Sequence, residues 1–172
     1  MPKIIENIRR QLLEVARAQI IRNGYEKTTI RSVAGECGVG VGTVYNYFPS
    51  KDMLIATFML EDWQECLARM AEAPADAEGL LSHMYTALRE FADRHSALFR
   101  DADAAKVFVS VFTERHKLLR TQLAQVVMPV CHRDTAEEKA FLAEFIAESL
   151  LSWTMAGEDF RRFAPVLLKL LK

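Results

Sequence analysis

One stretch of the chain decides its fold: residues 24–54, which read GYEKTTIRSVAGECGVGVGTVYNYFPSKDML. Thr29 suits the start of a helix, because its hydroxyl can accept a hydrogen bond from a backbone N–H of the first turn. Gly38 can adopt a positive φ and turn the chain after two turns of helix. A second, shorter helix over about 42–48 ends at Phe48-Pro49-Ser50. The stretch therefore predicts two short helices joined by a tight glycine turn.

Small and branched apolar residues make this pair of helices typical of a helix-turn-helix. Ala34 lets the two helices cross closely, and three residues would be buried between them and the preceding helix: Val33, Val39 and Val44. The outer face of residues 41–47 is then free to lie in a major groove. An arbitrary helical hairpin would show the same apolar pattern. It would not need Tyr45 and Tyr47, which are hard to explain as core and are natural contacts to phosphate oxygens and thymine methyls.

The same residues resemble the DNA-binding domain of the tetracycline-repressor (TetR) family. The resemblance covers about residues 5–55 and includes Gly24-Tyr25, the threonine cap, the helix-turn-helix and the closing run Tyr45 to Lys51. It implies a dimeric repressor that binds a double-stranded DNA operator and carries an inducer-binding C-terminal domain. The remaining two thirds of the chain resembles the family only in length and helical content.

Positions matched to the family give the expected DNA contacts. Arg31 is expected to reach a base or a phosphate, Thr43 and Tyr45 to contact the groove, and Tyr47 and Lys51 to anchor phosphates. Thr29 is expected to offer its hydroxyl or its backbone N–H to a phosphate. The full expected set is Thr29, Arg31, Gly42, Thr43, Tyr45, Asn46, Tyr47 and Lys51.

The start of the recognition helix departs from the family pattern. Where many members have a polar or basic residue, this chain has Gly40, Val41 and Gly42. Hydrogen-bonded reading of bases is therefore sparse here. We expect close backbone approach and sequence-dependent DNA shape to supply more of the specificity.

Charge is distributed unevenly along the 172 residues. The net charge is −1, but residues 1–52 hold eight basic and five acidic residues, and residues 53–172 hold fourteen and eighteen. A positive excess at one end is expected where only that end meets phosphate. No apolar run is long enough to span a bilayer and the N-terminus has no signal-peptide pattern, so we expect a cytoplasmic protein without a membrane partner.

Helical periodicity dominates the whole chain and predicts an all-α fold. A three-helix head joins a helical bundle through a long fourth helix, with the DNA-binding domain over 1–50 and a sensing and dimerisation domain over 51–172. The expected helices cover about 4–23, 29–38, 42–48, 51–72, 78–94, 96–101, 103–127 and 135–156, followed by a last helix in which Pro165 starts or kinks the helix.

Large apolar side chains of the second domain are interpreted first as core. The alternative is a ligand pocket among the helices, made adaptable by methionines. Its expected residues are Met59, Trp63, Cys66, Met70, His83, Met84, Phe108 and Phe112. The sequence does not identify the ligand.

The run 136–156 is apolar nearly all round, and the last helix is similarly rich in large apolar residues. A helix without a polar face must be covered on both sides, so we expect a two-fold interface with a second copy of the chain. The expected interface residues are Phe141, Phe145, Leu150, Trp153, Phe160 and Phe163. The alternative is that both helices are core elements of a monomer.

Other classes of protein explain the sequence less well. The three cysteines and four histidines match no metal or disulfide spacing, so we expect no metal and no cofactor. The glycine cluster 35–42 matches neither of the two common phosphate-binding loop motifs, G-x-x-x-x-G-K-[ST] and G-x-G-x-x-G. This argues against an enzyme. A purely helical interaction module would not need the short tyrosine-bearing helix. We expect a DNA-binding regulator, released from DNA when a small molecule bound beside the fourth helix shifts that helix, although this helix could also be a passive strut.

Overall fold

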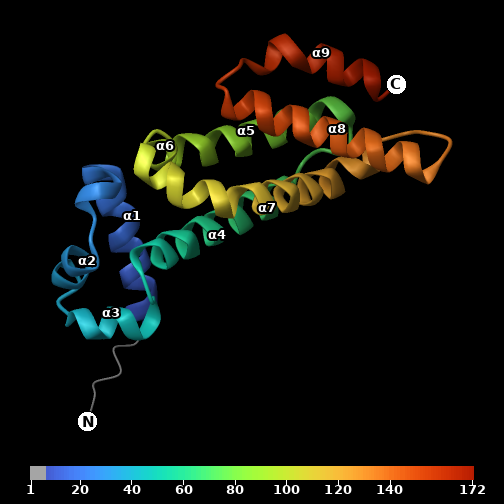
Figure 1. The fold of residues 1–172 in the computed structure, drawn as a ribbon. Coiled ribbons are helices and arrows are strands. Elements are labelled where there is room, and N and C mark those ends of the chain that lie inside the picture. The colour runs from blue at the N-terminus through green and yellow to red at the C-terminus, as the bar shows by residue number, and fades with distance from the viewer. Residues whose placement is uncertain (1–6) are drawn as a thin grey trace. The chain divides into compact units, whose positions relative to one another are not determined.

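The computed structural model describes residues 7–172, and for residue 103 and residues 105–115 it describes the backbone only. Within these limits every regular element is helical (Figure 1). The elements are α1 (Ile8–Lys27), α2 (Ile30–Glu36), α3 (Val41–Tyr47), α4 (Lys51–Met70), α5 (Ala77–Arg94), α6 (Ser96–Phe99), α7 (Ala102–Val127), a 3₁₀ turn (Met128–Val130), α8 (Ala136–Met155) and α9 (Phe160–Leu170). The predicted all-α fold is confirmed.

Helix boundaries agree with the predictions to within about two residues at most ends. The start predicted near residue 4 lies outside the described residues. The predicted end at Asn23-Gly24 corresponds to a break inside α1, where Gly24 has a φ of 79°. Pro165 neither starts α9 nor ends it: α9 begins five residues earlier, capped by the Asp159 carboxylate, which accepts from the Arg161 backbone N–H.

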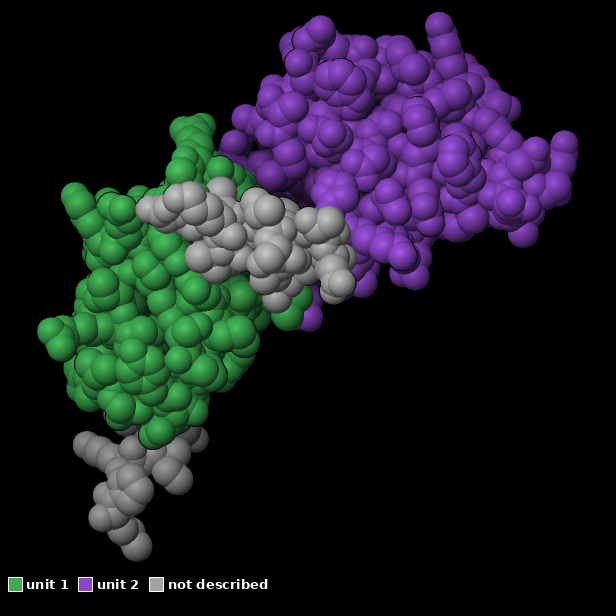
Figure 2. Space-filling view, viewed as in Figure 1, with its two compact units in different colours: residues 1–62, 94–108 green, residues 63–93, 109–172 purple. Residues whose placement is uncertain are grey.

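The chain forms two compact units (Figure 2). Unit 1 comprises residues 1–62 and 94–108, and unit 2 comprises residues 63–93 and 109–172. Unit 1 therefore contains the head together with the first part of α4 and the segment around α6. The functional division at residue 50 remains a prediction.

The core of unit 1 lies among the three head helices and the start of α4. The apolar stripe of α1 is buried, and so are Val33, Ala34 and Val44 between α2 and α3. Leu54 and Ile55 close this core from α4. α1 also packs against α6, which joins the head to the segment after α5.

The core of unit 2 gathers the second part of α4, α5, the end of α7, α8 and α9. Its most deeply buried large side chains include Met70, Leu81, Met84, Leu88, Leu123 and Ile146. α8 begins with a capping box, in which Thr135 accepts from the Glu138 backbone N–H and Glu138 accepts from the Thr135 N–H. Among the described helices, none has the length and apolarity that a bilayer crossing requires.

Candidate nucleic-acid interface

Gly38 makes the turn between α2 and α3. Its φ is 67°, the left-handed conformation that glycine adopts at little cost. The backbone N–H of Val39 donates to the carbonyl of Ala34 at 3.0 Å, which closes the end of α2. Val44, fully buried, fixes α3 against the rest of the head. The tight turn predicted from the sequence is therefore present, and it leaves the other face of α3 open.

Gln19 joins α1 to α2 and is buried although it is polar. Its amide nitrogen donates to the Ser32 carbonyl at 3.1 Å and to the Glu36 carboxylate at 2.7 Å. The Ser32 hydroxyl donates back to the Gln19 side-chain oxygen at 2.6 Å. The hydrogen bond from Gln19 to Glu36, together with that from Arg22, holds the pKa of Glu36 below its ordinary value. Gln19 lies at helical spacing with the buried Ala16 and Ile20 of α1, but its sequence position gives no sign of these partners.

The outer face of α3 exposes the residues expected to meet DNA. Tyr45 and Tyr47 are 51% and 45% exposed, and Asn46 and Gly42 are exposed beside them. Thr43 is half-buried. Two aromatic rings with hydroxyl tips on a seven-residue helix form a surface suited to phosphates and base edges.

Two residues at the start of α2 extend the candidate surface. Arg31 is exposed. Thr29 forms a capping box with Ser32, in which the Thr29 backbone N–H donates to the serine hydroxyl at 2.9 Å. The Thr29 hydroxyl oxygen accepts from the Ser32 N–H at 3.0 Å. Of the two groups expected to reach a phosphate, the backbone N–H is thus already used, and the hydroxyl hydrogen is the better candidate.

Lys51 is held against the end of α1. Its Nζ donates to the Tyr25 carbonyl at 3.0 Å and lies 3.5 Å from the centre of the Tyr25 ring. The Tyr25 hydroxyl donates to Asp52 at 2.6 Å. The ammonium is therefore fixed in place before any DNA arrives, which reduces the entropy lost if it binds a phosphate.

The residues expected to line a ligand pocket are mostly packed in the core. Met59 is buried in unit 1, and four others are buried in unit 2: Trp63, Cys66, Met70 and Met84. Trp63 donates its indole N–H to Gln122 at 2.8 Å, and its ring meets that of Phe91 edge to face. His83 is half-buried, with Nε2 2.9 Å from the Arg69 carbonyl oxygen. The side chains of Phe108 and Phe112 lie outside the described residues.

The expected interface residues on α8 and α9 fall into two groups. Phe141, Phe145 and Trp153 are exposed and Phe160 is half-buried, whereas Phe163 is largely buried. Leu150 is fully buried in the core of unit 2. The prediction that it contacts a partner chain directly is therefore wrong. Leu150 lies on the inner face of α8. Because the sequence of α8 is apolar nearly all round, it could not show which residues face inward.

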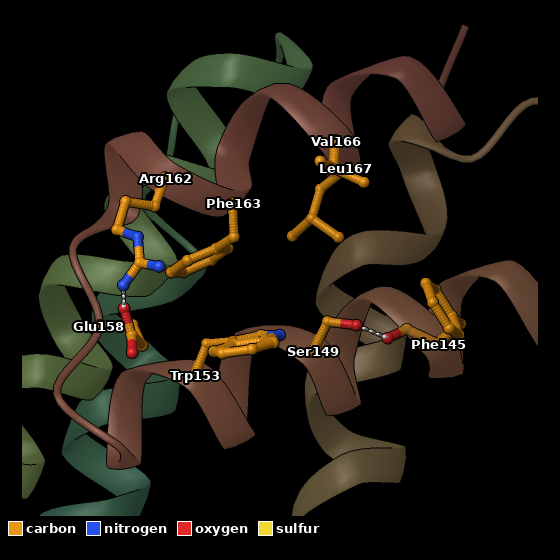
Figure 3. Close-up of a pocket in the computed structure, with 8 residues that line it drawn as sticks. All are labelled: Phe145, Ser149, Trp153, Glu158, Arg162, Phe163, Val166 and Leu167. Atoms are coloured by element: carbon orange, nitrogen blue, oxygen red, sulfur yellow. Dashed lines mark hydrogen bonds and ion pairs between the residues drawn. The ribbon is translucent and has the colours of Figure 1, made fainter.

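A groove of about 310 Å³ runs between α8 and α9 (Figure 3). Trp153 and Phe163 stack in it with ring centres 6.4 Å apart, and Phe145 and Val166 lie farther along it. Arg162 and Glu158 form an ion pair at one end. Apart from that pair and Ser149, the lining is apolar.

Comparison with known proteins identifies the head. A model of the N-terminal region of bacterial regulatory proteins of the tetR family matches residues 12–57. The transcriptional regulator UidR of Escherichia coli is 33% identical over 64 residues, which are 37% of this chain and 33% of UidR. The repressor KstR of Mycobacterium tuberculosis is 27% identical over 157 residues, covering 84% of this chain and 70% of KstR. The match to UidR thus spans only about one third of that relative.

Solved structures extend the likeness to the whole fold. A transcriptional regulator from Rhodococcus has a TM-score of 0.61 at 18% identity and covers 95% of this chain and 91% of its own. The TetR-family repressor AlkX from Dietzia has a TM-score of 0.60 at 17% identity, with 94% and 98% covered. The proteins named here are regulators and not enzymes, as expected from the sequence. Residues 12–57 therefore match the N-terminal region of bacterial regulatory proteins of the tetR family, and the fold of the chain resembles that of solved transcriptional regulators, the TetR-family repressor AlkX among them.

Proposed function

We propose that this chain is a sequence-specific transcriptional repressor that binds its operator as a homodimer and leaves it when a small molecule binds unit 2. The observation that carries the DNA-binding part is the exposed face of α3. Tyr45, Asn46 and Tyr47 stand on a helix whose other face is locked into the head, and Arg31 is exposed on α2. This arrangement presents donors and aromatic edges on a helix, the element that a major groove admits.

The dimer is supported by the α8–α9 surface. Phe141 is 72% exposed, and Val166 adds a further large apolar side chain at 59%. Monomeric proteins rarely expose contiguous apolar patches of this kind. Two copies related by a two-fold axis would cover each other's patch and present two recognition helices about 34–36 Å apart, or a multiple of that spacing, to successive major grooves.

Release by a ligand is supported by the composition of unit 2. Its core contains the methionines Met70 and Met84, two cysteine thiols and the buried Thr154 hydroxyl, a mixture that can repack around an apolar ligand. α4 contributes residues to both units, which makes it the natural element to transmit a change. A coupling of about 1–3 kcal/mol would weaken DNA binding 5–150-fold, and DNA would weaken the ligand equally.

A selection from random DNA duplexes tests the DNA-binding part. We expect the wild-type chain to enrich one operator with two-fold symmetry, and Tyr45→Ala to lose most of its affinity for that operator. Ile21→Ala is the matched control, because Ile21 is equally exposed but lies on α1 outside the helix-turn-helix. Failure to enrich any sequence, or equal losses in the two variants, would contradict the proposal.

Release is tested with small molecules extracted from natively purified protein and identified by mass spectrometry. Adding the identified compound back should weaken operator binding, and operator should weaken binding of the compound by the same factor. A compound that binds unit 2 without changing either affinity would rule out the switch.

A further inference from the structure

A buried carboxylate in the middle of α4 has partners on two other elements of unit 1. Asp62 is only 5% exposed. The guanidinium of Arg17, on α1, donates to both of its oxygens, from Nη2 at 2.6 Å and from Nε at 3.2 Å. This two-pronged geometry is the strongest form of a carboxylate–arginine contact. One side of Asp62 is thereby bound to the head.

The other partners of Asp62 come from the segment that follows α5. His95 is 2% exposed, and its Nε2 lies 3.1 Å from Asp62 Oδ2. Arg94 Nη1 lies 3.7 Å from Oδ1. The ring of Phe58, one turn earlier on α4, stacks on His95 and lies under the Arg17 guanidinium. A single carboxylate therefore joins α1, α4 and the start of α6.

Electrostatics make this joint sensitive to the loss of any member. Burial by itself raises the pKa of Asp62, but the hydrogen bond from His95 and the charge and hydrogen bonds of Arg17 outweigh it, so that the pKa lies below its ordinary value. The carboxylate is thus charged in the folded protein. Removing its charge leaves part-buried cations without their counterion, which is much more disruptive than removing an exposed pair.

The preceding residue provides a natural contrast. Glu61 also pairs with an arginine of α1, at 2.9 Å from Arg9. Both side chains of that pair are about half exposed, and none of the described contacts of Glu61 involves residues 94–99. Glu61 and Asp62 therefore differ in two respects: burial, and the link to the start of α6.

We propose that Asp62 is a positioning residue that sets the pose of the DNA-binding head from the C-terminal end of α5. Arg94 is the last residue of α5, so a displacement of that end moves Arg94 and His95 and, through the shared carboxylate, Arg17 and α1. Asp62 touches no DNA in this scheme. The inference rests on the proposed DNA-binding function, and it names the side chain through which the head is regulated.

The test compares Asp62→Asn with Glu61→Gln in the full chain. Using a duplex selected by the wild type, we expect Asp62→Asn to bind about tenfold more weakly or worse and Glu61→Gln to stay within about twofold. Amide hydrogen exchange, measured on the same proteins without DNA, should become faster both around Arg17 and over residues 94–99 in Asp62→Asn only. A merely local structural role would loosen α4 alone.

Equal DNA affinities for the two variants, or an affinity of Asp62→Asn equal to or above that of the wild type, would overturn the proposal. Unchanged exchange at residues 94–99 would also overturn it. If Asp62→Asn does not fold, Arg17→Gln replaces it, with the same expected loss on DNA and the same faster exchange at 94–99. If the wild type selects no duplex at all, the proposed function fails, while the exchange comparison still decides whether the joint exists.

Discussion

Among the side chains that the structure describes, exposed aromatic rings gather on α3 and on α8, and the chemistry of the two surfaces differs. On α3 they are tyrosines, each with a hydroxyl at its tip, beside Asn46 and within a positively charged head. On α8 they are Phe141, Phe145 and Trp153, beside an apolar groove. The hydroxyl groups of the first surface can keep hydrogen bonds in a hydrated, charged interface. The second surface gains most free energy when a partner covers it and excludes water. Exposure alone therefore does not separate the two surfaces, whereas the hydroxyl groups that only the α3 rings carry do.

The largest effect is expected on the apolar surface. Phe145→Glu places a charge in the proposed dimer interface, at a cost of about 3–5 kcal/mol or more, which weakens association at least about a hundredfold. Sedimentation equilibrium should then show a monomer with greatly reduced operator affinity. Leu118→Glu is the control, because Leu118 is as exposed as Phe145 but does not line the groove. A wild-type chain that sediments as a monomer at micromolar concentration would contradict the proposal that this apolar surface is a dimer interface.

The next largest effect is expected at Lys51, the cation beside the tyrosine-bearing surface of α3. Lys51→Ala should weaken binding to all DNA sequences similarly and reduce the slope of log K against log salt by about one unit, because one phosphate contact is lost. Tyr25→Phe serves as the control: it removes the neighbouring hydrogen bond to Asp52 but keeps the ring and the carbonyl that hold the Lys51 ammonium, so the slope should not change. An unchanged slope in Lys51→Ala, with an altered base preference, would mean that Lys51 reads sequence instead.

A smaller effect separates DNA contact from folding. A Cβ added at Gly35 or Gly42 would meet nothing within 4 Å. Alanine at either helical site should therefore stabilise the head by about 0.5–1 kcal/mol. Only Gly42 lies on the face of α3 proposed to approach DNA, so Gly42→Ala should bind operator several-fold more weakly while its melting temperature rises. Equal operator affinities in the two variants would show that the backbone does not approach DNA closely there.

The head was the part most open to prediction from sequence. Its turn, cap and exposed tyrosines are set by local chemistry within about thirty residues, and each appeared as expected. The joint at Asp62 was not predicted, because Arg17, Asp62 and His95 are far apart in sequence and each alone looks like an ordinary surface charge. Leu150 was misplaced for a different reason. An all-round apolar helix carries no sign of which face is inside.

The smallest effect lies at the start of α9, which carries part of the apolar surface. The side-chain hydrogen bond from Arg161, together with the Arg161 backbone N–H, lowers the pKa of Asp159 from 3.8 to about 2. The stabilising contribution of this carboxylate is therefore full above about pH 4 and is lost as the pH falls towards 2. An NMR titration should give a midpoint well below 3.8 that moves back up in Arg161→Gln. A midpoint near 3.8 in the wild type would mean that the ion pair does not persist in solution.

Unit 1 is formed by two separate stretches of the sequence, and this affects its folding during synthesis on the ribosome. Residues 94–108 belong to the same compact unit as the head, although 31 residues of unit 2 come between them and residue 62. At about 5–20 residues per second, the head emerges several seconds before the segment that carries His95. During that interval Asp62 can pair with Arg17, but its contacts with Arg94 and His95 cannot yet form. The nascent chain therefore exposes a DNA-binding head before the segment that completes its unit has been made.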